Sequence, residues 1–133
     1  MIKGINHITL AVQDLEREFD FYTRVLGLKP LSKRAGIAAY LLAGETWLAL
    51  VQESKPVAKN YSHLALSVSS QDLQNLKDKI LAYGTLSWQD NQTFGESFYF
   101  EDQSGNRLEL HTSDLESRLD NMRNLKDSNI EFY

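Results

Sequence analysis

Two segments of the chain place a histidine at the same position of the same pattern. Residues 4–12 read G-I-N-H-I-T-L-A-V and residues 60–68 read N-Y-S-H-L-A-L-S-V, so His7 and His63 are 56 positions apart. Both segments alternate aliphatic residues with polar or small ones, which predicts β-strands with one aliphatic face. The histidine begins the opposite face in each strand.

Glu109 lies in a third segment of this kind. Leu108 and Leu110 share one face of the strand, and Glu109 and His111 lie on the other. Two imidazoles and a carboxylate suit a divalent transition metal whose open positions take substrate oxygens, as Lewis-acid catalysis requires. A lone strand histidine is more often just a polar residue, and the repeat is what favours a metal site. His111 is one step, about 6–7 Å, along the strand from Glu109, and we expect a neighbour rather than a ligand.

The elements around these strands repeat as well. An apolar stripe at helical spacing over residues 15–26 follows the first histidine strand, with Asp14 as the expected N-cap and Gly27 as the stop. A second helix begins after Ser69 and stops at Gly84, and each half ends in a pair of strands joined by a turn. Neither half closes a core alone, so the two must pair. The apolar stripe consists of Leu15, Phe19, Tyr22 and Leu26 in the first helix, and of Leu73, Leu76 and Ile80 in the second.

The sequence therefore predicts an α+β fold of two paired βαβββ modules in one domain, residues 1–133. Module one covers about residues 4–51 and module two about residues 60–112. A C-terminal helix and tail fill residues 113–133, and a capping box of Ser113 and Glu116 starts this helix. The helix stripe is Leu115, Leu119 and Met122.

Composition excludes several classes of function. The 133 residues include no cysteine, so there is no disulfide framework and no cysteine nucleophile, and thiol chemistry here needs a thiol from outside. A net charge of −4 is unlike a nucleic-acid binder, so no nucleic-acid partner is expected. No apolar run approaches the roughly 20 residues of a membrane span, and the N-terminus lacks a signal-peptide pattern. We expect a cytoplasmic protein without membrane contact.

Further residues on the face of the histidines suit a small polar ligand held against aromatic rings. Ordinary packing is an equally good interpretation of Tyr40 and Trp47. Residues 88–97 are rich in carbonyl, amide and hydroxyl groups and read as a loop, in which Gly95 allows an unusual backbone angle. The residues in question on this face are Thr9, Tyr40, Trp47, Ser97 and Tyr99.

With these motifs the chain resembles the vicinal oxygen chelate superfamily of glyoxalases, extradiol dioxygenases, and fosfomycin or bleomycin resistance proteins. Within it, the chain is most similar to the fosfomycin resistance thiol transferases, specifically the glutathione-using branch. The resemblance covers essentially the whole chain. The segments that carry it are residues 5–12, 39–41, 47–50, 61–63, 95–100, 105–111 and 114–119.

The resemblance implies a homodimer with modules swapped between chains. Each site would hold Mn²⁺ or another divalent metal, with His7 from one chain and His63 and Glu109 from the other. Fosfomycin would bind the metal, Thr9 would hydrogen-bond its epoxide oxygen, and glutathione would attack. The resemblance also implies phosphonate contacts from Arg118, Tyr99 and Ser97, walls formed by Tyr40 and Trp47, and a K⁺ site at Asn91, Thr93, Gly95, Ser97 and Tyr99.

Two departures from the family pattern stand out. Gln89 occupies a position where this branch typically has a phosphonate-contacting lysine, and Thr93 stands where serine is usual. Residues 29–44 contain no Asp or Glu, which argues against the water-using hydrolase branch.

Two alternative functions remain open. One is an Fe(II) extradiol-type dioxygenase on the same three ligands, with only His111 as an acid–base group. The other is a non-catalytic drug-binding protein, which the intact ligand set disfavours.

Overall fold

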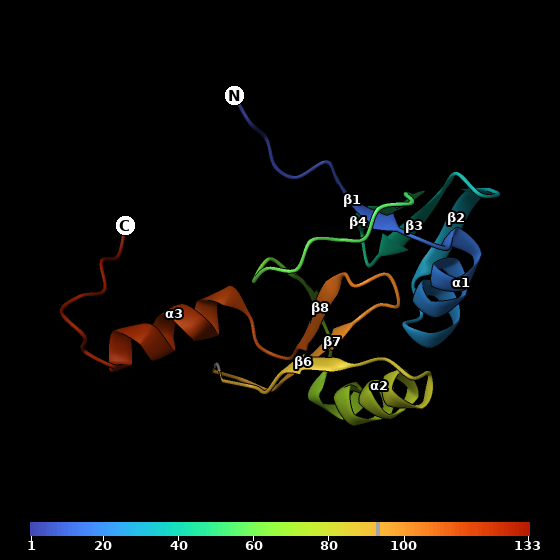
Figure 1. Ribbon diagram of the computed structural model, residues 1–133. Helices are drawn as coiled ribbons and strands as arrows, with labels where there is room; N and C mark the ends of the chain where they lie inside the picture. Colours follow the sequence, from blue (N-terminus) through green and yellow to red (C-terminus); the bar gives the residue numbers. More distant parts are fainter. Residues whose placement is uncertain (93) are drawn as a thin grey trace.

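The chain folds into two modules with the same order of elements (Figure 1). The computed structural model describes residues 1–92 and 94–133. The first module contains β1 (His7–Val12), α1 (Leu15–Asp20), the π-helical turn η1 (Phe21–Val25), β2 (Lys29–Arg34), β3 (Ala38–Ala43) and β4 (Thr46–Gln52). The second contains β5 (Leu64–Ser67), α2 (Ser70–Ala82), β6 (Ser87–Gln89), β7 (Ser97–Glu101) and β8 (Arg107–His111), and is followed by α3 (Leu115–Asn124).

Each module forms a four-stranded sheet with the same topology. The strand orders are β1-β4-β3-β2 and β5-β8-β7-β6, and the first strand of each module pairs in parallel with its last. The registers match as well. Thr9 pairs with Ala49 and Ala49 with Tyr40, just as Ala65 pairs with Glu109 and Glu109 with Tyr99. The prediction of an α+β fold with two βαβββ modules is confirmed, and Ala49 is the symmetry equivalent of Glu109.

Two strands left little signal in the sequence. β2 has the sequence K-P-L-S-K-R and is exposed along its whole length, so it carries no alternation of apolar and polar residues. β6 is only three residues long and lies partly inside the segment that reads as a loop. Both are edge strands, and main-chain pairing with β3 and β7 defines them.

The first helix is less regular than its stripe predicts. Asp14 caps it by accepting the amide hydrogen of Arg17, and Gly27 ends it at a φ of +78°, both as expected. At Phe21 the helix widens into the π-helical turn η1, in which the Leu26 N–H donates to the Phe21 carbonyl. Phe19, which precedes this turn, and Leu26, which follows it, are only half-buried. The fully or nearly fully buried residues are Leu15, Glu18, Phe21, Tyr22 and Val25.

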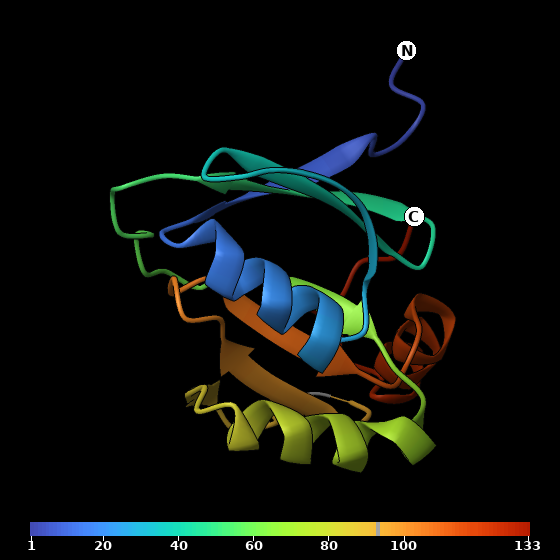
Figure 2. The same ribbon diagram turned by 90° about the vertical axis from the view of Figure 1, so that its right-hand side faces the viewer.

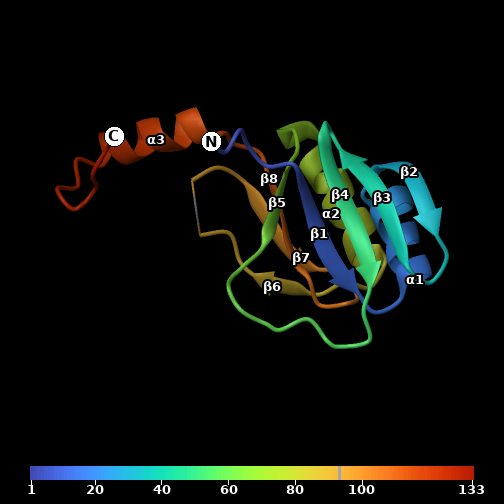
Figure 3. The same cartoon turned by 90° about the horizontal axis from the view of Figure 1, so that it is seen from above.

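The start of the third helix corrects a prediction. Asp114, not Ser113, is the N-cap of α3, and its carboxylate accepts the Ser117 N–H at 2.8 Å. These hydrogen bonds from Ser117 lower the pKa of Asp114, because they stabilise the charged form. The expected apolar stripe is also not covered within one chain: α3 projects away from both sheets (Figures 1 and 3), and Leu115 is 72% exposed. None of the helices in the described chain is long and apolar enough to cross a membrane.

The helix-facing sides of both modules share one hydrophobic core. Figure 2 shows α1 beneath the first sheet and α2 alongside the second. The core draws aliphatic and aromatic side chains from both modules, including Leu15, Phe21, Leu41, Leu50, Ile80, Phe100 and Leu108. Because the aliphatic faces are used here, the faces that carry the two histidines point outward from this core.

Buried polar groups also join the two modules. The β7–β8 turn reaches the first module, where Asp102 accepts from the Tyr22 hydroxyl at 2.8 Å and the Ser104 hydroxyl donates to Glu18 Oε1 at 3.0 Å. Asn106 Nδ2 donates to the Ala11 carbonyl at 2.8 Å. Glu18 is fully buried. Burial, and then the charge of Asp102, raise the pKa of Glu18 from 4.5 to about 7.

The raised pKa of Glu18 predicts a pH-dependent stability. The folded state binds the proton more tightly than the unfolded chain, so the free energy of unfolding should fall as pH rises from about 4.5 to about 7. The shift corresponds to a loss of about 3 kcal/mol at most. Glu18→Gln should remove this loss, so the variant should gain stability relative to wild type as pH rises from about 5 to about 8. Urea unfolding at several pH values measures the difference.

Glu45→Gln is the matched control, because it makes the same chemical change at a carboxylate that is exposed rather than buried. A Glu18→Gln variant whose stability difference from wild type stayed constant with pH would contradict the assignment of a proton to Glu18.

Candidate metal and substrate site

A buried carboxylate is the centre of the polar face of the second sheet. Glu109, on β8, is 5% exposed. Its Oε2 lies 2.9 Å from Nε2 of His63, which immediately precedes β5, and its Oε1 accepts the Ser97 hydroxyl of β7 at 2.7 Å. His111 Nδ1 lies 3.3 Å from the same Oε1. The structure therefore brings together His63, Ser97 and Glu109, as predicted, with His111 as a neighbour.

The contacts of His63 fit a cation between it and Glu109. Its Nδ1 lies 2.9 Å from the Tyr61 carbonyl, which can only accept, so Nδ1 carries a hydrogen. In the neutral ring, Nε2 then presents a lone pair to a carboxylate oxygen. Two acceptors facing each other require a shared cation, which is either a proton or a metal ion. A carbonyl that orients the far nitrogen of an imidazole is also the usual support of a metal-binding histidine.

Aromatic rings surround this pair. Tyr99 is 2% exposed, and its ring lies 6.1 Å from that of His63 and 5.1 Å from that of Trp88. Trp88 of β6 also lies 5.5 Å from His63, and the Arg107 guanidinium lies 4.8 Å above its ring. Sequence reasoning missed Trp88 because it treated the residue as the start of a polar loop. The sequence did contain a sign of this role, because Trp88 is a large hydrophobic residue directly before Gln89 in a segment that is mostly polar.

Arg118 and Gln89 approach the same face from two sides. Arg118, in the first turns of α3, lies 3.5 Å from Nε2 of His111. Gln89 is half-buried and pairs with Tyr99 across the β6–β7 ladder. A cationic side chain thus lies at the edge of the cluster, and a neutral amide side chain belongs to the residue of β6 that pairs with Tyr99.

The segment before β7 contains Asn91 and Gly95, two of the residues expected at a K⁺ site. Asn91 Nδ2 donates to the Gly95 carbonyl at 2.8 Å, which links these two residues. Gly95 has a φ of +88°, and a Cβ there would lie 2.8 Å from Ser113 Cβ and 3.3 Å from His111 Cε1. Glycine is required here for both backbone conformation and space. Thr93, another residue of this prediction, lies outside the described residues.

The remaining predicted residues lie together on the first sheet. The rings of His7 and Trp47 are 4.3 Å apart, and those of Trp47 and Tyr40 are 5.1 Å apart. His7 and Thr9 are exposed, and Tyr40 is 43% exposed. Trp47 Nε1 is buried and has no hydrogen-bond partner among the described residues. This aromatic face is open in a single chain.

One chain does not assemble the three predicted ligands. Within residues 1–92 and 94–133, no group of three His, Asp or Glu side chains converges so that it could hold a metal ion. His63 and Glu109 meet on the second sheet, whereas His7 is on the first, with its Nδ1 2.7 Å from Asn6 Oδ1. The site in a single chain is therefore a pair of ligands that needs a third.

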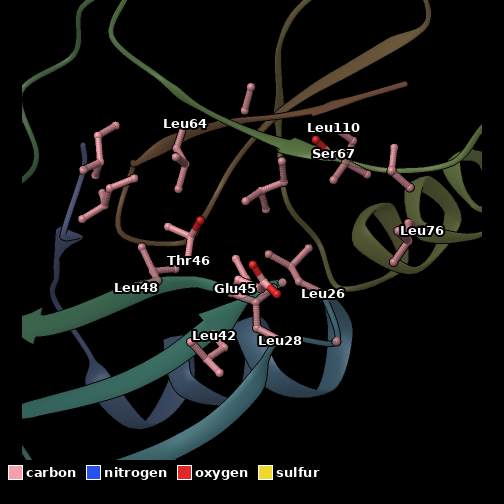
Figure 4. Close-up of a pocket in the computed structure, with 18 of the residues that line it drawn as sticks. Leu26, Leu28, Leu42, Glu45, Thr46, Leu48, Leu64, Ser67, Leu76 and Leu110 are labelled. Carbon is pink, nitrogen blue, oxygen red and sulfur yellow. The ribbon is translucent and has the colours of Figure 1, made fainter. Parts of the chain in front are cut away.

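A cavity of about 680 Å³ elsewhere in the chain is distinct from this site. Figure 4 shows it between the modules, where Leu26 and Leu48 of the first face Leu64 and Leu110 of the second. None of the predicted ligand or substrate residues lines it. Its walls are mostly aliphatic, its polar lining residues are Asn6, Glu45, Thr46 and Ser67, and no Lys, Arg or His among the lining residues could pair with a phosphonate.

Known proteins share both the sequence and the fold. Residues 4–110 match the model of the Glyoxalase/Bleomycin resistance protein/Dioxygenase superfamily. The glutathione transferase FosA of Serratia marcescens is 36% identical, over 90% of this chain and 87% of that protein. The metallothiol transferase FosB of Staphylococcus haemolyticus is 34% identical, over 100% of this chain and 99% of that protein.

Solved structures agree with these relatives. The fosfomycin resistance protein FosX of Listeria monocytogenes, in complex with Mn(II) and 1S,2S-dihydroxypropylphosphonic acid, has a TM-score of 0.83 and 26% identity, with 92% of this chain and 99% of that chain covered. FosX of Mesorhizobium loti has a TM-score of 0.77 and 29% identity, with 90% and 99% covered.

The chain belongs to the glyoxalase, bleomycin resistance protein and dioxygenase superfamily. Its relatives within that superfamily are the fosfomycin resistance proteins, so the predicted resemblance to fosfomycin resistance thiol transferases is confirmed.

The crowding at Gly95 predicts a large effect of one methyl group. Gly95→Ala should destabilise the protein more than Gly84→Ala does. Both glycines have a positive φ, +88° and +94°, but a Cβ at Gly84 meets nothing within 4 Å. Each substitution places a residue with a Cβ at a positive φ, which costs about 1–2 kcal/mol. Only Gly95→Ala adds a collision with Ser113. Denaturant unfolding measures both, and equal losses would contradict the close approach.

Proposed function

We propose that this protein is a divalent-metal-dependent transferase that adds an external thiol, glutathione first among them, to the epoxide of fosfomycin. The observation that carries the proposal is the His63–Glu109 pair at 2.9 Å, set among Ser97, Tyr99 and Arg118 in a relative of the FosA and FosB transferases. Such a pair is suited to hold a cation, and the arginine beside it is suited to bind an oxyanion.

His7, His63 and Glu109 would hold the metal, and Mn²⁺ is the ion named with the related FosX structure. When bound, the metal supplies Lewis-acid stabilisation of the negative charge that develops on the epoxide oxygen. Thr9 lies two residues after His7 on the same exposed face, and its hydroxyl would donate a hydrogen bond to that oxygen.

The rest of the face would bind the phosphonate and shape the substrate region. Arg118, Tyr99 and Ser97 would be the phosphonate contacts, and Gln89 would offer an amide where the resemblance to the glutathione-using branch implies a lysine. Tyr40 and Trp47 form a wall. A K⁺ ion beside the phosphonate would use Asn91, Thr93, Gly95, Ser97 and Tyr99. A phosphonate carries up to two negative charges, which explains why cations would gather on this side.

The nucleophile has to come from outside, because the chain contains no cysteine. The thiolate sulfur forms a bond to an epoxide carbon, the bond from that carbon to oxygen breaks, and the oxygen then takes up a proton. Water could replace the thiol, as the diol named with the related FosX indicates. Residues 29–44 offer no carboxylate as a general base for water, which favours the thiol.

The third ligand would come from a second copy of the chain. In one copy Tyr40 is 43% exposed and Leu115 of α3 is 72% exposed. A homodimer with swapped modules would cover these groups and bring His7 of one chain to His63 and Glu109 of the other.

A direct assay tests the function. Incubation of fosfomycin and Mn²⁺ with glutathione, bacillithiol, cysteine or no thiol, followed by mass spectrometry, should give the glutathione adduct. Chelation should abolish it, and Glu109→Ala should lose metal affinity because an anionic ligand is removed. The exposed Glu45→Gln should leave turnover unchanged. Diol as the main product would replace the transferase by a hydrolase, and turnover by metal-free Glu109→Ala would refute the chelate mechanism.

Subunit complementation tests the shared site. His7→Ala and Glu109→Ala should each be inactive as homodimers. A mixed dimer should carry one site with both lesions and one intact site, so unfolding and refolding the two variants together should restore part of the activity. An active monomer in sedimentation, or mixtures with no recovered activity despite heterodimer formation, would count against a site that spans two chains.

A further inference from the structure

We propose that Arg107 is a positioning residue that fixes His63 in place against Glu109, by holding the turn at residues 60–63 and the ring of Trp88. The inference rests on the proposed metal site and deepens it, because it concerns how one of the proposed ligands is kept in position. The geometry that points to it is the set of contacts that Arg107 of β8 makes with three separate segments, namely the linker before β5, β6 and β7.

His63 needs support from outside its own segment. Within the described residues 1–92, the stretch 53–63 forms neither a helix nor a strand, and His63 is its last residue, directly before β5. A ligand at the end of such a stretch has no strand pairing to fix the backbone that leads to it. The accurate placement that a metal ligand requires therefore has to come from contacts with the neighbouring sheet.

The guanidinium of Arg107 is engaged on three sides. Its Nη1 donates to the carbonyl of Asn60, and its Nε lies 3.5 Å from Oε1 of Glu101, the residue opposite it on β7. Its central carbon lies 4.8 Å from the centre of the Trp88 ring. Glu101 is 8% exposed, so the ion pair is largely shielded from water. A planar guanidinium with five N–H donors can make these three contacts at once, which the single ammonium of a lysine cannot.

The bond to Asn60 reaches His63 through a short turn. Asn60 Oδ1 accepts the Ser62 N–H at 2.8 Å, and the Tyr61 carbonyl lies 2.9 Å from Nδ1 of His63. Because β8 holds the Asn60 carbonyl and the Asn60 side chain closes the turn, the carbonyl of the next residue is directed at the imidazole. The orientation of His63 thus depends on a backbone position that Arg107 fixes.

The contact with Trp88 supports the same imidazole by packing. The Trp88 ring lies 5.5 Å from that of His63 and 6.0 Å from that of Tyr61, and its Nε1 donates to the Leu108 carbonyl at 3.1 Å. Arg107 therefore contacts both supports of the imidazole, the turn and the indole. All of these residues lie in the second module or in the linker before it, so the arrangement is complete in one chain and does not depend on a second copy.

The direction of one effect separates positioning from charge. A positive side chain near a metal site repels the cation, so Arg107→Ala would tighten Mn²⁺ binding if charge were its only influence. Loss of positioning acts in the opposite direction. Lys59 provides the matched control, because its Nζ lies 3.1 Å from Oε2 of the same Glu101, and its side chain is 60% exposed.

Mn²⁺ affinity, measured by calorimetry on the full-length protein, tests the role. Arg107→Ala and Arg107→Lys should both bind Mn²⁺ about 10-fold or more weakly, the usual effect of losing a partner that orients a metal ligand. Lys59→Met, which also removes one positive charge, should bind at least as tightly as wild type. Arg107→Lys keeps the charge and most of the apolar stem, so it decides the question if Arg107→Ala fails to fold.

Three results would overturn the proposal. They are wild-type or tighter binding in Arg107→Ala, wild-type binding in Arg107→Lys, and a loss in Lys59→Met as large as that in Arg107→Ala.

Backbone ¹⁵N relaxation in the metal-free protein separates a local effect from a general one. The amides of residues 61–63 should have order parameters of about 0.85 in wild type and in Lys59→Met, and below about 0.6 in the two Arg107 variants. The amide of Leu50, in the core of the first sheet, should stay rigid in every variant. Unchanged order at residues 61–63, or an equal loss of order at Leu50, would overturn the positioning role.

The readouts are independent of turnover, because neither uses fosfomycin or a thiol. A protein whose Mn²⁺ affinity depends on Arg107 as described, but which does not modify fosfomycin, would refute the proposed function and support the role of Arg107. A wild-type protein that binds no Mn²⁺ would refute the proposed metal site and this inference with it.

Discussion

The negative charge of Glu109 is the constraint around which the polar face of the second sheet is arranged. A carboxylate that is 5% exposed is destabilised unless hydrogen bonds or cations compensate for the water it has lost. Ser97 satisfies one oxygen and His63 approaches the other. The same burial would strengthen the proposed role of Glu109 as a metal ligand, because a cation against Oε2 in this low-dielectric setting would be held strongly.

The repeated module explains why the second half carries this charge and the first does not. In the first sheet the register places Ala49 where the second sheet has Glu109, and Tyr40 where it has Tyr99. Ala49 is buried, at 3% exposed, and adds no charge to the face that carries His7 and Trp47.

The two modules need a rigid connection if residues on separate sheets are to serve a shared site. The core that both modules share provides most of it. The β7–β8 turn provides directional contacts, with Asp102 bound by Tyr22 and Ser104 bound to Glu18. These polar groups are buried and hydrogen-bonded, so they fix one arrangement of the modules more specifically than apolar contact alone. This arrangement has an energetic cost, because burial disfavours the charged form of Glu18 and so raises its pKa.

The sequence alone determined the local features of this protein. Alternation of aliphatic and polar residues predicted the histidine strands and β8, Asp14 and Ser69 marked helix starts, and the 56-residue repeat predicted two βαβββ modules with His7 and His63 at equivalent positions. These succeed because strand periodicity and capping depend on neighbours in the chain. Local patterns did not predict the exposed β2, the short β6 or the π-helical turn, because pairing with other strands and packing against the core define these elements. Only the tertiary structure decided that His63 faces Oε2 of Glu109 through its Nε2, that Trp88 joins the aromatic rings around this pair and that His111 lies between Arg118 and Ser97. Those contacts join residues up to 46 positions apart, and no local pattern specifies which of two oxygens or nitrogens each will face.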